Sequence, residues 1–260
     1  MIFYFSGTGN TRYVAESLGN LLDEDLVFIP GTDPNSVKLT GNRVLFCFPV
    51  YSWGVPPLVL DFIAALPDSF VGEAKAADIA VSMVCTCGDE VAETPAMFRN
   101  TIASRGLRTG GLWSVTMPND YVLLPGFDVD PREVEDRKLD SSQGRIKEIA
   151  GLISRGEYRE DYTVGKWPRL KSKVIYPLFR RWGVNPKRWH VSQECVGCGR
   201  CVTACPMHNI KLVTGKPHWG HNCVSCTACY QHCPAHAISY GRFTDGKGQY
   251  FCHVKPLKKH

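Results

Sequence analysis

The chain has 260 residues, long enough for two compact domains, and 44% of them are hydrophobic, which suffices for ordinary buried cores. It contains no run of 18 or more apolar residues, and residues 1–5 lack the features of a signal peptide. Residues 1–161 carry 14 basic and 23 acidic residues, a net charge of −9, whereas residues 162–260 carry 16 and two, a net charge of +14. The sequence therefore predicts a cytoplasmic protein without a membrane span, built from two parts of opposite charge.

Residues 1–155 alternate between short apolar runs and amphipathic segments, the pattern of strands and helices in α/β proteins. The expected strands are 2–5, 26–29, 44–48, 79–84 and 112–117. The expected helices are 12–22, 56–66, 91–105 and 134–154. Because five strands alternate with helices, we expect a parallel sheet that is covered by helices on both faces.

The first loop, SGTGNT at residues 6–11, joins the first strand to the first helix. Hydroxyl and backbone N–H groups at a helix N-terminus bind phosphate, and glycine allows the backbone to approach it closely. A dinucleotide fingerprint would have glycine where Arg12 stands, and a P-loop would need a lysine that this loop lacks. The remaining alternatives are a phosphate site of another kind and a simple capped helix start.

The SGTGNT loop resembles the FMN-phosphate loop of the flavodoxins, and this resemblance extends over residues 1–155. It implies a flavodoxin-like five-stranded sheet of order 2-1-3-4-5 with FMN at the switch point. It also implies that Tyr51 or Trp53 covers the flavin face and that the peptide at Gly54 turns over near the flavin N5 atom. Surface aromatics packed on the next helix are the alternative. The loop after the fourth strand would meet the pyrimidine edge of the flavin.

A further turn, MPNDY at residues 117–121, resembles one found in flavodoxin-like domains fused to ferredoxin repeats. Asn119 or Tyr121 would close the flavin pocket there, with ordinary loop packing as the alternative. The residues expected to bind FMN are therefore Ser6, Gly7, Thr8, Gly9, Asn10, Thr11, Pro49, Val50, Tyr51, Ser52, Trp53, Gly54, Thr86, Cys87, Gly88, Asp89, Asn119 and Tyr121.

Residues 156–190 break the α/β pattern and form a predicted connector. Residues 162–193 contain eight basic residues and no acidic one, together with several aromatic residues. An apolar stripe within residues 170–182 predicts one helix. Aromatic and basic residues together also raise the alternative of nucleic-acid binding. A packed linker with a solvated basic face is the favoured interpretation, so no nucleic-acid partner is expected.

Nine of the 12 cysteines lie in the last quarter of the chain, where CVGCGRCVTACP at 195–206 is repeated as CVSCTACYQHCP at 223–234. Each copy is the C-x2-C-x2-C-x3-C-P run of bacterial ferredoxins, whose fourth cysteine binds the other cluster. Zinc sites are the alternative, but they use separated C-x2-C pairs and need no third cysteine at the same interval. We therefore expect two [4Fe–4S] clusters, one held by Cys195, Cys198, Cys201 and Cys233 and the other by Cys205, Cys223, Cys226 and Cys229.

The whole chain resembles flavodoxin–ferredoxin fusions, which are found largely in anaerobes. The resemblance implies a flavodoxin-like FMN-binding domain at 1–155, a basic and partly helical connector at 156–190, and a small α+β bacterial-type ferredoxin domain at 191–260. The favoured function is electron transfer between FMN, two [4Fe–4S] clusters and external redox protein partners. The alternative is a ferredoxin-linked, FMN-dependent reductase of a small oxidised substrate, and a homodimer also stays open.

Overall fold

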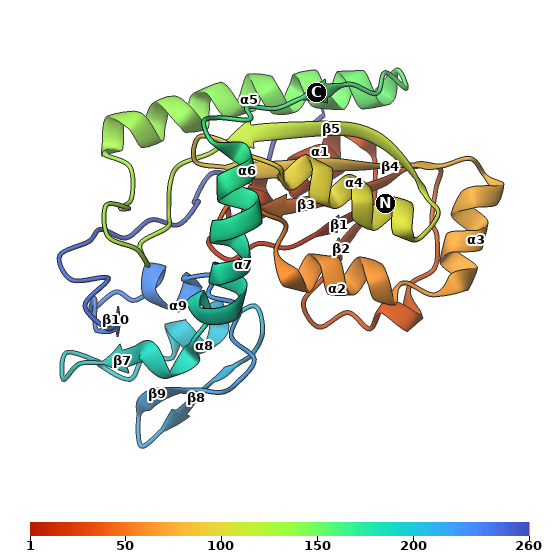
Figure 1. The fold of residues 1–260 in the computed structure, drawn as a ribbon. Helices are drawn as coiled ribbons and strands as arrows, with labels where there is room; N and C mark the ends of the chain where they lie inside the picture. The colour runs from red at the N-terminus through yellow and green to blue at the C-terminus, as the bar shows by residue number, and fades with distance from the viewer. Residues whose placement is uncertain (260) are drawn as a thin grey trace.

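The computed structural model describes residues 1–259 and shows an α/β domain joined through a helical connector to a smaller cysteine-rich unit (Figure 1). The first domain contains a six-stranded sheet of order β2-β1-β3-β4-β5-β6. Within residues 1–259, no helix combines the length and apolar character needed to cross a bilayer.

The central sheet is parallel throughout and has the flavodoxin-like order 2-1-3-4-5 that we expected. Its strands are β1 (Ile2–Tyr4), β2 (Leu26–Phe28), β3 (Val44–Pro49), β4 (Ala80–Cys87), β5 (Arg108–Thr116) and β6 (Glu160–Asp161). The expected count of five strands was wrong by one, because β6 pairs with Leu112 and Trp113 of β5. Both residues of β6 are exposed and acidic, so no apolar pattern marks this strand.

Helices cover the two faces of the sheet, with α5 on one side and α2 on the other in Figure 1. The helical elements of this domain are α1 (Asn10–Leu22), the 3-10 helix η1 (Pro34–Ser36), α2 (Pro57–Ala65), α3 (Asp68–Ala76), α4 (Thr94–Ser104) and α5 (Arg132–Ser154). Successive strand residues point to opposite faces. Thus Phe3 belongs to the core cluster that includes Phe62 of α2 and Phe98 of α4, whereas Ile2 joins the core beneath α1 and α5.

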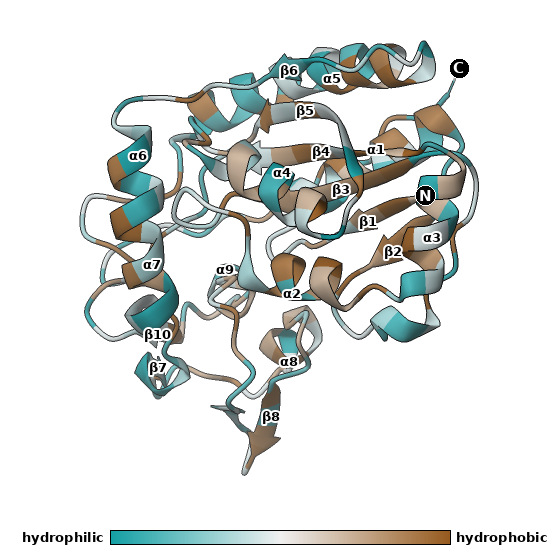
Figure 2. Ribbon diagram, turned by 45° about the vertical axis from the view of Figure 1, so that its right-hand side comes forward, coloured by the Kyte–Doolittle hydropathy of each residue, from teal (hydrophilic) through white to brown (hydrophobic). Residues whose placement is uncertain are grey.

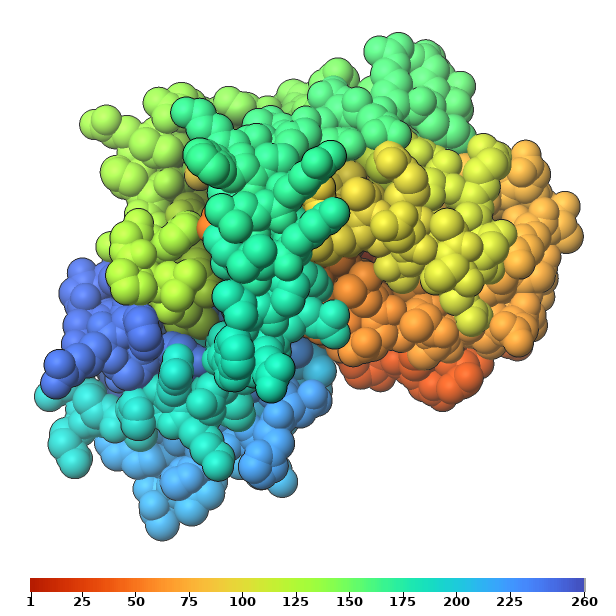
Figure 3. Space-filling model, in the orientation of Figure 1, coloured from red at the N-terminus to blue at the C-terminus, as the bar shows by residue number. Residues whose placement is uncertain are grey.

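The connector forms one continuous helical rod from Pro168 to Gly183. Along the rod lie α6 (Pro168–Leu170), the π-helix η2 (Lys171–Ile175), α7 (Tyr176–Leu178) and the π-helix η3 (Phe179–Gly183); the short 3-10 helix η4 (Pro186–Arg188) follows. Pro177 lies inside the rod and has no N–H to donate, which accounts for irregular helical turns beside it. The rod stands on the outside of the molecule and spans from the first domain to the cysteine-rich unit (Figures 1 and 3).

The cysteine-rich unit contains two small antiparallel sheets and two short helices. Its elements are β7 (Trp189–Val191), α8 (Arg200–Ala204), β8 (Ile210–Val213), β9 (Lys216–Trp219), α9 (Ala228–Gln231) and β10 (Ile238–Tyr240). Strand β8 pairs with β9, and β10 pairs with β7. A third buried cluster containing Trp189, Ile210 and Tyr240 fills the unit. These elements form the expected small α+β domain.

Candidate functional site

A cavity of about 410 Å³ lies at the carboxyl ends of β1, β3, β4 and β5. Ligands of doubly wound sheets bind at this edge, where the strand order reverses, here between β1 and β3. Of the 18 residues predicted to bind FMN, 16 line the cavity, and only Gly9 and Gly54 do not. The remaining wall comes from residues that the sequence did not assign to the flavin site, including residues 225–227 of the cysteine-rich unit.

The loop at residues 6–11 has the conformation of an anion site. Gly9 has a φ of 100°, in the left-handed region, and its N–H donates to the Ser6 hydroxyl at 3.2 Å. Helix α1 begins at Asn10, so its unpaired first-turn N–H groups and the positive end of its dipole are at the loop. The Thr11 hydroxyl shares a hydrogen bond of 2.7 Å with Thr86 of β4. These donors fit the phosphate group of a flavin mononucleotide.

Asp120 places a carboxylate beside the same loop, where it accepts a hydrogen bond from the Thr8 hydroxyl. Burial raises the pKa of Asp120 to about 6, although the Thr8 hydrogen bond opposes the rise. Asp120 lines the cavity but was missed, since no sequence pattern links it to Thr8, 112 positions away. At neutral pH the carboxylate adds negative charge next to the predicted phosphate position.

The loop after β3 holds two aromatic side chains at the cavity in a strained turn. Tyr51 and Gly54 exchange backbone hydrogen bonds of 2.9 and 3.0 Å. The residues between them, Ser52 and Trp53, have φ values of 47° and 62°, a conformation that non-glycine residues seldom adopt. Such strain concentrates at functional sites. The Trp53 indole N–H donates to Glu90 at 2.9 Å, which fixes its ring at the cavity wall.

The connector rod packs against the Tyr51–Gly54 turn and supports it. The Ser172 hydroxyl donates to the carbonyl oxygen of Trp53 at 2.7 Å. A Cβ atom on Gly54 would lie 2.4 Å from a ring carbon of Tyr176, so only glycine fits against the rod there. Phe179 of the rod lines the cavity itself. The connector is therefore part of the site, which the sequence did not indicate because its apolar stripe predicts a helix but not the surface that this helix covers.

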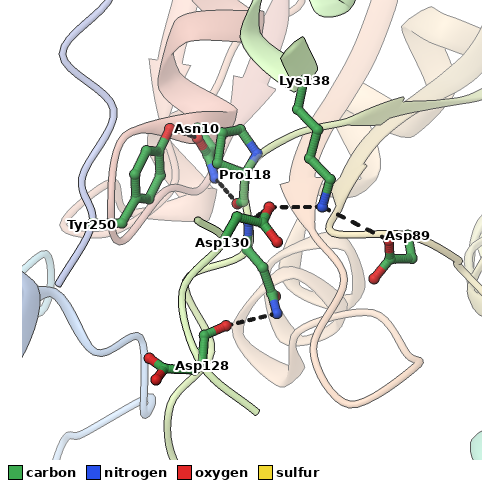
Figure 4. A network of polar contacts seen from close by, with 8 residues as sticks. Asn10, Asp89, Pro118, Asp128, Asp130, Lys138 and Tyr250 are labelled. Carbon is green, nitrogen blue, oxygen red and sulfur yellow. Dashed lines mark hydrogen bonds and ion pairs between the residues drawn. The ribbon is translucent and has the colours of Figure 1, made fainter. Parts of the chain in front are cut away.

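Polar contacts tie the loops after β4 and β5 together (Figure 4). Lys138 of α5 forms ion pairs with Asp130 at 2.7 Å and Asp89 at 3.7 Å. The amide side chain of Asn119 donates to the carbonyl oxygen of Asp128 at 3.1 Å. These contacts hold Asp89 and Asn119 in the cavity wall, where each side chain already has a partner within the protein.

Cys85 and Cys87 end β4 next to the cavity, and only Cys87 lines it. Burial raises the pKa of Cys87 to about 12 and raises that of Cys85 well above its usual value. Both side chains are therefore neutral thiols at physiological pH. Neutral thiols supply apolar packing at this position rather than a metal ligand.

The eight repeat cysteines fall into two groups, which we call the far set and the near set by their distance from the cavity. The far set, Cys195, Cys198, Cys201 and Cys233, lines one small cavity. The near set is Cys205, Cys223, Cys226 and Cys229; burial, together with the neighbouring Cys223 and Cys205 thiols, raises the pKa of Cys226 to about 12. In each set, the fourth cysteine of one repeat lies with the first three of the other.

Within residues 1–259, no three His, Cys, Asp or Glu side chains converge as a single metal ion requires. A cubane cluster binds each thiolate to a separate iron and does not need such convergence. Cluster ligation therefore remains a prediction that rests on the repeat and on this grouping.

Two tryptophans beside the near set help to identify the group that these cysteines would bind. Trp189 and Trp219 stack with ring centroids 6.1 Å apart, and their buried Nε1 atoms have no hydrogen-bond partner by distance and angle among residues 1–259. Burial raises the pKa of Cys223 and Cys229, and the nearby indole groups of Trp189 and Trp219, respectively, partly oppose the rise. Indole N–H groups can only donate. Buried, unpaired donors next to these sulfur atoms fit a negatively charged iron–sulfur cluster.

The near set and the cavity share a wall at Cys226. This residue lines the cavity and also packs against the core of the first domain. A Cβ atom on Gly7 of the phosphate loop would lie 2.7 Å from the Cys226 Cβ and 2.8 Å from its carbonyl oxygen. The absence of a side chain at Gly7 therefore allows the cysteine-rich unit to contact the loop directly.

The C-terminal segment returns from the cysteine-rich unit to the first domain. The backbone N–H of Cys252 donates to the Thr8 carbonyl at 2.8 Å, and the Tyr250 hydroxyl donates to the Asn10 side chain at 2.7 Å. Further along, the N–H of Leu257 donates to the Ser17 hydroxyl of α1 at 3.0 Å. These hydrogen bonds connect the C-terminal segment to the phosphate loop and to α1 of the first domain.

Residues 194–238 match the family model of the 4Fe-4S dicluster domain, a range that includes all eight repeat cysteines. A comparison with curated proteins found no match. Solved structures also resemble part of the chain, and three of them are described below. A Bacteroides uniformis protein assigned as a flavoprotein is 16% identical with a TM-score of 0.35, covering 45% of this chain and 88% of that one.

The second structure, a Bacteroides eggerthii protein assigned as a flavoprotein, is 19% identical with a TM-score of 0.30 and covers 43% of this chain and 85% of that one. The third, the Trp repressor binding protein of Bacillus subtilis, is 17% identical with a TM-score of 0.33 and covers 45% and 83%. The first domain is called flavodoxin-like because of its strand order 2-1-3-4-5, and not because of these partial similarities.

Proposed function

We propose that this chain, a flavodoxin-like domain joined to a ferredoxin domain, is an electron-transfer protein in which FMN and two [4Fe–4S] clusters connect external redox partners. The observation that carries the proposal is the contact of Cys226 with both the flavin cavity and Gly7. A predicted cluster ligand thus forms part of the wall of the predicted flavin site. An electron can pass between neighbouring cofactors there without crossing solvent.

FMN, when bound, supplies the capacity to take up two electrons and release them singly. The chain's own residues provide its position. The 6–11 loop binds the phosphate through backbone N–H groups and hydroxyls, and Tyr51 and Trp53 enclose the ring and exclude water. Trp189 and Trp219 direct N–H groups toward the near set. Hydrogen bonds of this kind stabilise the more negative, reduced cluster.

Exposure supports an order of flavin, near set and far set. Cys226 of the near set lines the flavin cavity and no far-set cysteine does, whereas Cys198 of the far set is exposed. Val196 beside it is 74% exposed. One external partner would therefore exchange electrons at the far set, and the other would do so at the flavin end of the relay. We also propose that the protein works in a reducing, oxygen-poor cytoplasm, because none of its 12 cysteines forms a disulfide bond.

Anaerobic purification followed by flavin, iron and metal analysis tests this proposal. We expect one FMN and about eight iron atoms per chain. Cys226→Ser should remove the near cluster and stop rapid electron exchange between flavin and the far cluster. The matched variant Cys198→Ser should remove only the far cluster and leave exchange between flavin and the near cluster. Zinc in place of iron, or a protein that binds no flavin, contradicts the proposal.

A further inference from the structure

The outer face of the connector rod carries an apolar ridge that neither domain covers. The ridge consists of Leu170, Val174, Leu178 and Trp182, at intervals of four residues, with exposed fractions of 49, 47, 45 and 58%. Trp167, just before the rod, is 73% exposed. Residues spaced by four share one helix face. Contiguous exposed apolar surface of this kind marks interaction sites. Figure 2 shows hydrophobic and hydrophilic positions alternating along the part of the rod labelled α6 and α7.

Basic side chains flank the ridge. Arg169, Lys173, Arg180 and Arg181 are all exposed, and residues 162–193 contain no acidic residue to neutralise them. The first domain is acidic by contrast, with a net charge of −9 over residues 1–161. In a symmetric dimer formed through this surface, one basic ridge would oppose another, so that arrangement is disfavoured. The surface is therefore complementary to a negatively charged partner.

The position of the ridge relates it to the flavin cavity. Phe179 lies on the inner face of the same rod and lines that cavity. A partner seated on the ridge would thus be separated from the cavity wall by at most one helix diameter, ~10 Å. The rod lies at the molecular surface over the junction of the two domains (Figure 3). Its outer face is accessible, while its inner face touches the redox site.

We propose that this ridge docks a small acidic redox protein that exchanges electrons with the flavin. This inference rests on the proposed function and names the class of partner and its entry point. In each exchange, one electron leaves the metal centre of the reduced partner, which is oxidised, and enters the flavin, which is reduced by one electron. Apolar contact along the ridge supplies affinity, and the basic flanks orient the partner and speed its association.

The test uses the full holoprotein and, as probe, a small acidic [2Fe–2S] ferredoxin in its reduced form. The double variant Arg169→Glu/Lys173→Glu reverses two exposed charges beside the ridge. Lys255→Glu/Lys258→Glu makes the same change of charge on the exposed C-terminal segment and serves as control. Complex formation is measured by calorimetry and flavin reduction by stopped-flow absorbance. We expect the first variant, and not the control, to weaken binding and slow reduction about tenfold at low ionic strength.

A second pair tests the apolar part of the surface. Leu178→Gln should weaken binding of the probe about fivefold at both low and high ionic strength. Val213→Gln changes an equally exposed residue on β8 and should leave binding unchanged. Equal effects of ridge and control variants overturn the proposal. So does a loss of rate confined to Arg200→Glu/Lys211→Glu, which would locate the partner at the far set instead.

The ridge variants also distinguish the ferredoxin from two other occupants of the ridge, an anionic membrane surface and a second copy of the chain. Ridge-dependent binding to phosphatidylglycerol vesicles without binding of the ferredoxin, or ridge-dependent self-association, overturns the proposal. Reduction by dithionite and cofactor analysis of the same samples separate this inference from the proposed function. Normal cofactor content with ridge-independent reduction by the ferredoxin refutes only the docking site. Absence of flavin or iron refutes the proposed function itself.

Discussion

At the scale of single residues, Asp120 introduces a negative charge where the flavin phosphate is expected. Because its pKa is raised to about 6, the carboxylate is protonated below that pH and ionised above it. Ionised Asp120 would repel a phosphate, so FMN affinity should fall as pH rises through about 6. We expect Asp120→Asn to bind FMN roughly tenfold more tightly than the wild type near pH 8, with little difference near pH 5.

Fluorescence titration of the flavin-free protein measures this effect. The phosphate group itself ionises near pH 6, so the comparison with Asp120→Asn at each pH isolates the contribution of Asp120. Riboflavin, which has no phosphate, serves as a second control and should show a smaller difference. The raised pKa also means that Asp120 favours folding at low pH and that this contribution is lost above about pH 6. An equal affinity of both proteins for FMN near pH 8 would refute repulsion by Asp120.

The indole N–H of Trp219 acts at the same scale on the near set. It lowers the pKa of Cys229 as a hydrogen-bond donor, and a donor stabilises the reduced cluster for the same electrostatic reason. Trp219→Phe keeps an aromatic ring against Trp189 and removes only the donor. We expect the midpoint potential of the near cluster to fall by roughly 40 mV, equivalent to about 1 kcal/mol. A redox titration followed by EPR measures it, with the exposed Trp182→Phe as control; an unchanged or higher potential contradicts the prediction.

At the scale of elements, the connector rod fixes the Tyr51–Gly54 turn through Ser172. The Ser172 hydroxyl is buried; it accepts from the Glu93 N–H at 3.0 Å and donates to the Trp53 carbonyl at 2.7 Å. Ser172→Ala leaves both backbone groups without this partner, at a cost of about 1–3 kcal/mol in the free energy of unfolding. Because the strained turn loses its support, flavin affinity should fall about tenfold.

Denaturant unfolding and flavin titration test both parts of this prediction. Lys173→Ala, one residue further along the rod and exposed, is the matched control and should change neither quantity. A loss of stability with unchanged flavin affinity would show that the rod supports the fold but not the site.

The elements themselves show what sequence patterns can and cannot predict. The five longer strands were located because short runs rich in apolar residues mark them, as the buried run Val44–Phe48 does in β3. The two-residue strand β6 was missed because its exposed acidic residues resemble a loop. Helix α3 was also missed, since only Phe70, Val71 and Ala74 of its nine residues are buried. The rod was expected as a helix, but its contact with the Tyr51–Gly54 turn depends on packing between segments over 100 positions apart.

At the scale of the whole molecule, local motifs predicted both cofactor sites but not their contact. The phosphate loop and the cysteine repeat each follow from short-range spacing, which one sequence displays directly. The meeting of Gly7 with Cys226 joins positions 219 residues apart and depends on how two folded domains dock. Opposite net charges favour docking but do not select the surfaces. Hydrogen bonds from the C-terminal segment to Thr8 and Asn10 contribute to that selection.

The docking geometry predicts that Gly7→Ala separates the two domains locally while each keeps its fold. The added methyl group would overlap the Cβ and carbonyl oxygen of Cys226, and backbone atoms cannot rotate away as a flexible side chain would. The cysteine-rich unit must therefore shift from the phosphate loop. Since electron transfer weakens steeply with separation, exchange between flavin and the near cluster should slow about tenfold or more, with iron content unchanged.

Rapid-mixing absorbance of the flavin and cluster bands measures that exchange rate. Gly144→Ala is the matched control: this glycine lies in α5, and a Cβ atom there would contact nothing within 4 Å. Alanine at that position should leave the rate unchanged and stabilise the helix by up to about 1 kcal/mol. An unaltered rate in Gly7→Ala, with FMN and both clusters bound, would mean that electrons do not pass through the Gly7–Cys226 contact. The relay would then need another route between the domains.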